Sequence, residues 1–147
     1  MKVAVFALIS LLFNLNIGPQ EPEELHSITI EVYDLRNSKG TVHFALYNDK
    51  TTFPDQKFEK HLIKGKSEII DNKSVITFHD VPKDTYAVAI FHDENNNNKI
   101  DKGLILPKEG LGFSNYTSLN IKNKPRFSRA SFELTQDETI KVKTVYM

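Results

Sequence analysis

Apolar and polar residues alternate along much of this chain, a pattern typical of β-strands that bury one face. Apolar side chains occupy every second position in residues 28–32 and 42–46, and Ile140, Val142, Thr144 and Tyr146 alternate with other residues towards the end of the chain. The turn-forming residues 37–40 separate the first two stretches. We therefore expect these two stretches to form an antiparallel hairpin, and the third stretch to be the last strand.

Shorter apolar runs add further strands. Residues 86–91 are apolar on both faces, which predicts a central strand, and residues 74–78, 68–70 and 132–134 are strand-like. Residues 48–66 are irregular and fit either a short helix or a loop over the core. About seven short strands and no long amphipathic helix predict an all-β fold, a single β-sandwich of immunoglobulin-like or prealbumin-like type.

The N-terminal segment has the pattern of an export signal. Lys2 precedes an apolar run of about a dozen residues, the size of a signal-peptide core and shorter than the roughly twenty residues that span a membrane. We predict a signal peptide at 1–20, a lead-in at 21–26 and one β-sandwich domain at 27–147. The alternative is a buried N-terminal helix or strand. We expect export to the periplasm or the extracellular space, with membrane contact only during export.

Composition narrows the function classes. A chain of 147 residues is one domain's worth, and 19 basic against 19 acidic residues argue against a nucleic-acid partner. With no cysteine, disulfides, thiol nucleophiles and Cys-ligated metals are excluded. The chain has no G-x-S-x-G or H-E-x-x-H motif, and its five histidines are scattered singly. We therefore name no catalytic residue and expect no enzyme.

The segment that carries candidate chemistry follows the predicted central strand. Calcium takes six to eight oxygen ligands, and a tight loop with oxygen side chains at positions 1, 3 and 5 and a backbone carbonyl at position 7 can supply them. Residues 93–101 alternate in this way, with Lys99 offering its backbone carbonyl. The sequence predicts a structural Ca²⁺ site formed by Asp93, Asn95, Asn97, Lys99, Asp101 and Glu109.

This loop departs from the EF-hand pattern at two positions. Position 6 is Asn98 instead of glycine, although asparagine tolerates the left-handed conformation. Position 12 is Leu104, so the last carboxylate has to come from Asp101 or Glu109. A solvated Asn-rich turn that binds nothing is the alternative. Magnesium prefers a more compact geometry, and the adjacent His92 alone does not make a zinc site.

Residues 107–115 have two interpretations. Glycines at positions 110 and 112 allow a close approach of the backbone. The segment can fold back and close the ion loop, with Glu109 as a ligand or hydrogen-bond acceptor. Alternatively, it can form the rim of a ligand cleft with Lys108, Ser114, Asn115 and Arg126.

Residues 82–101 and 107–115 resemble a bacterial family, the domain-of-unknown-function family 2141, and the resemblance extends from about Ile28 to Tyr146. It implies an exported protein with one β domain and implies no reaction. The family usually has a glycine where Lys83-Asp84 stands, and Asn-Gly pairs where Asn96 and Asn98 stand.

Together these features predict an exported, calcium-stabilised β-sandwich that acts as a binding or structural module of the cell envelope. We expect a monomer whose ligand is an unidentified protein or glycan. One alternative is a metal-assisted hydrolase, in which the same ion polarises a phosphate or ester and Glu109 or His92 is the base. Another is a subunit of an envelope assembly, in which residues 140–146 pair with a partner's sheet edge.

Overall fold

The computed structural model describes residues 22–103, 107–120 and 122–147, so the predicted signal peptide lies outside the described residues. The described part contains eight strands and one short helix. Their bounds are β1 Leu25–Tyr33, β2 Thr41–Tyr47, β3 Ile63–Glu68, β4 Ser74–Pro82, β5 Thr85–Asp93, β6 Gly110–Phe113, α1 Phe127–Ala130, β7 Phe132–Glu133 and β8 Glu138–Lys143.

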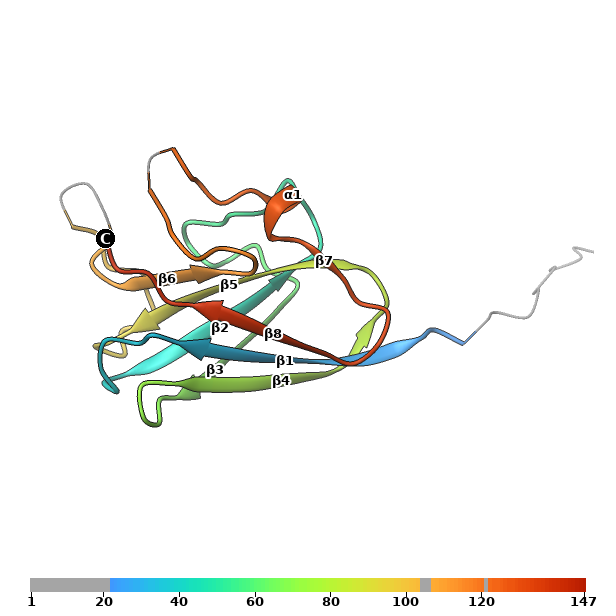
Figure 1. Cartoon of the computed structure of the whole chain (residues 1–147), viewed down its shortest axis with the longest axis horizontal. Helices are drawn as coiled ribbons and strands as arrows, with labels where there is room; N and C mark the ends of the chain where they lie inside the picture. Colours follow the sequence, from blue (N-terminus) through green and yellow to red (C-terminus); the bar gives the residue numbers. More distant parts are fainter. Residues whose placement is uncertain (1–21, 104–106, 121) are drawn as a thin grey trace, which may run out of the picture.

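The strands form two sheets that pack face to face (Figure 1). The smaller sheet has the order β4-β1-β8, and the larger has the order β3-β2-β5-β6, with β7 also paired to β5. Neighbouring strands are antiparallel except β1 and β8, which run parallel. The predicted all-β sandwich is therefore confirmed.

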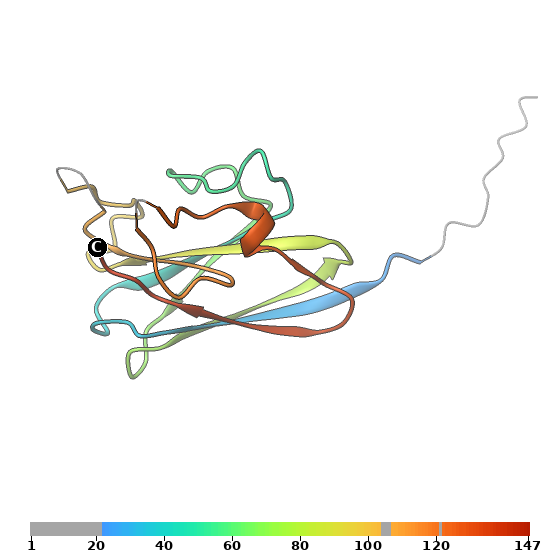
Figure 2. The same ribbon diagram turned by 45° about the horizontal axis from the view of Figure 1, so that its top comes forward.

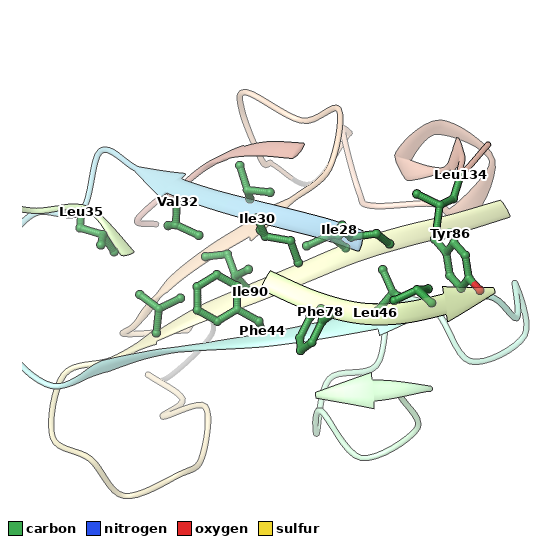
Figure 3. Packing of buried hydrophobic residues seen from close by; sticks show 14 residues of the cluster. Ile28, Ile30, Val32, Leu35, Phe44, Leu46, Phe78, Tyr86, Ile90 and Leu134 are labelled. Atoms are coloured by element: carbon green, nitrogen blue, oxygen red, sulfur yellow. The ribbon is translucent and has the colours of Figure 1, made fainter. Parts of the chain in front are cut away.

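The main core lies between the two sheets and is built by the alternating apolar positions. Ile28, Ile30 and Val32 of β1 point at Phe44 of β2 and Ile90 of β5, and all five are at most 1 % exposed (Figure 3). Fully burying one such aliphatic or aromatic side chain contributes about 1.5–3 kcal/mol. Packing of these faces alone therefore brings the two sheets together without a disulfide.

A second apolar cluster covers the outer face of the larger sheet. Ala87 and Ala89 of β5 point to this face, while Val88 and Ile90 point into the main core, so β5 is buried on both sides as predicted. Two long connections, residues 48–62 and the described residues of 114–131, lie over the outer face in both views (Figures 1 and 2). The irregular segment 48–66 is thus a loop up to residue 62, and β3 begins at Ile63, earlier than the short strand expected at 68–70.

The predicted hairpin between residues 28–32 and 42–46 is wrong. β1 pairs with β4 and β8, whereas β2 pairs with β3 and β5, so the connection between them crosses from one sheet to the other. Gly40, with a positive φ of 72°, lies immediately before β2 at the end of this crossing. β1 also begins at Leu25, inside the expected lead-in. In the parts of the chain that are described, no helix has the length and apolar character needed to cross a membrane.

Candidate ion-binding loop

The candidate loop leaves the larger sheet at Asp93, the last residue of β5. Asp93 is fully buried on the outer face of the sheet, and its Oδ2 lies 3.2 Å from Nε2 of His43 on β2. The His43 ring stacks on Phe91, with 4.4 Å between centroids. Burial lowers the pKa of His43, although Asp93 acts in the opposite direction. The lowered pKa favours the neutral form of His43, which weakens its electrostatic attraction to Asp93.

The backbone of the loop curls around the Asp93 carboxylate. Asp93 Oδ1 accepts the N–H of Asn97 at 3.1 Å, and Oδ2 accepts the N–H of Asn98 at 2.8 Å. The side-chain oxygens of Asn95 and Asn97 accept the N–H groups two residues further on. Asn96 and Asn98 adopt left-handed φ values of 56° and 60°. Both asparagines thus adopt the left-handed conformation that glycine adopts most readily.

Two further carboxylates join this turn. Asp101 accepts hydrogen bonds from the amide groups of Asn95 at 2.7 Å and Asn97 at 3.0 Å. Glu109 accepts the N–H of Asp101 through Oε2 at 3.2 Å, while its Oε1 is buried and has no partner among the described residues. Glu109 is only 3 % exposed, and this burial, with repulsion from Asp93 and Asp101, raises its pKa to about 7.

The structure therefore brings five of the predicted ligands together, and Lys99 lies in the same turn with its N–H bonded to Asn97. Each amide oxygen has two lone pairs, so Asn95 and Asn97 can ligate a cation while they still accept their backbone N–H. Within the described ranges, no three His, Asp or Glu side chains already surround one point as a metal cage. Binding an ion thus requires the carboxylates to move inward and displace the amide donors from Asp101.

An anchor for this loop was not evident from the sequence. Glu94 forms an ion pair with Arg36 and also accepts the side-chain N–H of Asn37, both in the connection between β1 and β2. These contacts, led by the hydrogen bond from Arg36, lower the pKa of Glu94 to about 2. The partners lie more than fifty residues apart in the chain. Only the pairing of strands brings them together, so no local pattern signalled the contact.

The segment 107–115 folds back onto the ion loop, the first of its two interpretations. The N–H of Lys108 donates to the carbonyl of Asp101 at 2.9 Å, and residues 110–113 form β6 beside β5. Ser114, one of the residues assigned to a cleft rim, is fully buried. Its hydroxyl accepts the N–H of Val88 and donates to the carbonyl of Ala130. The cleft-rim interpretation is therefore wrong for this serine.

His92 points to the opposite side of β5 from Phe91 and Asp93. Its ring is buried, with Nδ1 2.7 Å from the hydroxyl of Tyr146 and Nε2 2.7 Å from the carbonyl of Lys39. Both ring nitrogens of His92 therefore already have partners. Of the two bases considered for the hydrolase alternative, His92 and Glu109, only Glu109 is left. The C-terminal segment is also engaged, because Val145 exchanges two backbone hydrogen bonds with Leu111 beyond the pairing of β8 with β1.

These features define a small β-sandwich with an acidic, asparagine-rich loop at one end of its larger sheet. Residues 30–142 match the model of the family described as "Uncharacterized protein conserved in bacteria (DUF2141)". The chain belongs to this family, as its motifs indicated. No curated protein and no solved structure matches the chain.

Proposed function

We propose that this protein is an exported β-sandwich module of the bacterial cell envelope whose loop 93–101 binds a structural calcium ion. The observation that carries the proposal is the Glu109 carboxylate, 3 % exposed, with one oxygen unpartnered in the described structure, beside Asp93 and Asp101. Buried carboxylates are costly unless a cation or hydrogen-bond donors compensate them. Calcium supplies two positive charges at such a position.

The donor set matches the preference of calcium. Carboxylates from Asp93, Asp101 and Glu109, amide oxygens from Asn95 and Asn97, and the carbonyl of Lys99 are hard oxygen donors. Six donors of this kind meet the lower limit of calcium coordination, and a bidentate carboxylate raises the number. The chain has no cysteine, and His43, next to Asp93, is one nitrogen against six oxygen donors, so the donor set favours calcium over softer metals.

The ion has a structural role in this proposal. It joins the end of β5 to the residue that precedes β6, across residues 94–109, and so reduces the freedom of a long polar connection. Export supports the choice of ion, because free calcium is usually far higher outside the cytoplasm than inside. The module then presents a rigid sandwich to an envelope partner, a protein or a glycan.

A thermal unfolding experiment tests the calcium site. The purified protein is melted in excess chelator, in 1 mM calcium and in 1 mM magnesium. For a Kd of about 10 μM, 1 mM calcium adds about 2.7 kcal/mol to the unfolding free energy. The midpoint should then rise by several degrees. Magnesium should produce a much smaller rise.

Variants separate the loop from a general effect of salt. Asp93→Asn and Glu109→Gln should each remove the calcium-dependent rise. Asp71→Asn is the matched control, because Asp71 is an exposed carboxylate of another turn and asparagine tolerates its positive φ of 51°. Coincident melting curves with calcium and chelator would show that the loop is only a solvated turn.

A further inference from the structure

The outer face of the larger sheet is basic, although the whole chain is neutral. The connection 114–131 contains no Asp or Glu and four basic residues, Lys122, Lys124, Arg126 and Arg129. The other covering segment, residues 48–62, carries three lysines and three acidic residues, and β3 adds Lys64 and Lys66, which pair with Ala45 and His43 of β2. Both segments cover the same face, and all nine basic side chains are exposed. This face therefore has an excess of positive charge.

Two of the three acidic side chains of residues 48–62 accept hydrogen bonds within local turns. Asp55 accepts the backbone N–H groups of residues 57, 59 and 60, and Asp49 accepts the N–H and hydroxyl of Thr51. Neither Lys50 nor Arg126 belongs to an ion pair within the described residues. Arg129 differs, because its guanidinium lies over the Tyr116 ring and donates to Asn123.

Lys50 and Arg126 border a hollow between the two covering connections. Its walls are Phe53, Pro54, Pro125, Phe127 and Ser128, and its volume is about 380 Å³. Small-molecule sites range from about 300 to 1,000 Å³ and combine apolar walls with a few polar groups. The hollow is therefore large enough for one or two aromatic rings.

The apolar wall is held in place by ring packing. The Phe53 ring makes edge-to-face contacts with Tyr47 of β2, Phe113 of β6 and Phe127 of α1, at centroid distances of 5.4, 5.7 and 6.0 Å. These contacts join the hollow to two strands of the larger sheet. A wall that is already ordered loses little conformational entropy when a ligand binds.

We propose that this hollow binds a small amphipathic anion, a molecule that joins an aromatic or aliphatic group to one carboxylate or sulfonate. The apolar group contacts the phenylalanine and proline walls. The anionic group lies between Lys50 and Arg126, where the planar guanidinium can donate two parallel hydrogen bonds to one carboxylate. A neutral ligand of the same shape gains from the apolar walls but not from the two positive charges.

The site is independent of the calcium proposal. The hollow lies beside the segment that follows Tyr47, which pairs with Ala87 near the start of β5, whereas the ion loop leaves β5 at Asp93 (Figure 1). Failure of the calcium experiment would therefore leave this inference unaffected. Failure of this inference would likewise leave the calcium proposal unaffected.

Titration with 2-naphthoate, followed by amide chemical shifts of the whole protein in saturating calcium, tests the inference. We expect sub-millimolar binding, with shift changes at residues 50–54 and 125–128. Lys50→Gln with Arg126→Gln should weaken binding at least about tenfold, the loss expected when charge-assisted hydrogen bonds disappear. Both side chains are exposed, so the doubly substituted protein should keep the spectrum of the folded chain.

Matched controls make the result decisive. Lys141→Gln, on the smaller sheet, should leave the affinity unchanged, and 2-naphthalenemethanol, which lacks the charge, should bind at least about tenfold more weakly. Equal affinity for the two naphthalenes, or unchanged binding by the Lys50 and Arg126 variant, would overturn the inference. Binding to phosphatidylglycerol vesicles without binding to naphthoate would assign the face to a membrane surface and also overturn it.

Discussion

At the scale of single residues, Glu109 holds the most informative position. Its carboxylate is buried beside two others, and its pKa rises to about 7 from an ordinary value near 4.5. The folded state therefore binds more protons than the unfolded state between these two values. By linkage, Glu109 stabilises the fold below about pH 4.5, and this contribution is lost as the pH rises through 7.

We predict that Glu109→Gln removes this pH dependence in the absence of calcium. The difference in unfolding free energy between the variant and the wild type should increase in favour of the variant from pH 5 to pH 8. One unit of pKa shift corresponds to about 1.4 kcal/mol, so the increase should be of the order of 3 kcal/mol at most. Urea unfolding in chelator measures the difference. The lowered pKa of His43 changes the stability with pH in the opposite direction. Because His43 is present in both proteins, its contribution cancels in the difference between them. Parallel pH profiles would contradict the prediction.

At the scale of elements, Ser114 connects β6 to the covering segment 114–131. Its buried hydroxyl accepts the N–H of Val88 on β5 at 2.9 Å and donates to the carbonyl of Ala130 at 2.6 Å. The side chain thus joins a central strand, an edge strand and α1 with two hydrogen bonds. A buried N–H or carbonyl that loses its partner costs free energy comparable to a full hydrogen bond.

Ser114→Ala should therefore lower the unfolding free energy by about 1–3 kcal/mol, because it removes both bonds in a buried position. Ser128→Ala is the control, since Ser128 is exposed and alanine suits its position in α1. Urea unfolding of both variants measures the difference. A Ser114→Ala protein as stable as the control would show that the covering segment is held by its aromatic contacts alone.

At the scale of the whole molecule, the C-terminus ties both sheets to the ion loop. The hydroxyl of Tyr146 contacts Nδ1 of His92 at 2.7 Å and accepts the backbone N–H of Arg36 at 3.1 Å. The Arg36 guanidinium lies 4.5 Å from the centre of the Tyr146 ring and pairs with Glu94 of the loop. Residues from three distant parts of the chain thus form one network.

Tyr146→Phe should keep the ring packing and lose both hydroxyl contacts. We expect a cost of about 1–3 kcal/mol in unfolding free energy, measured by urea unfolding, because the His92 ring is buried. Tyr33→Phe is the control, since no hydrogen bond involves the Tyr33 hydroxyl in the described structure. An equal effect of the two changes would show that the network adds nothing beyond its apolar contacts.

Strand interiors were predictable, and strand partners were not. Residues 86–91 are apolar on both faces and form the central part of β5, as expected. Residues 28–32 and 42–46 are strands as expected, but the alternation cannot tell whether two strands share a sheet or face one another across a core. Here the two strands face one another across the core. The turn residues 37–40 between them led to the wrong prediction that they pair.

The candidate loop shows the same division. Alternating oxygen side chains after a buried strand, with asparagines at the left-handed positions 96 and 98, pointed to one compact turn, and the structure has that turn. The contacts of His43 with Asp93 and of Arg36 with Glu94 were not predictable, because each joins residues about fifty or more positions apart. Such contacts depend on strand register.

The all-β class, the buried faces of β1, β2 and β5 and the conformation of the turn after β5 follow from local sequence, because side-chain alternation and backbone preference act between neighbouring residues. Strand pairing, the connections that cover the larger sheet and the carboxylates that become buried are set by long-range packing. These outcomes depend on how distant apolar faces pack together, and that packing energy belongs to no single segment.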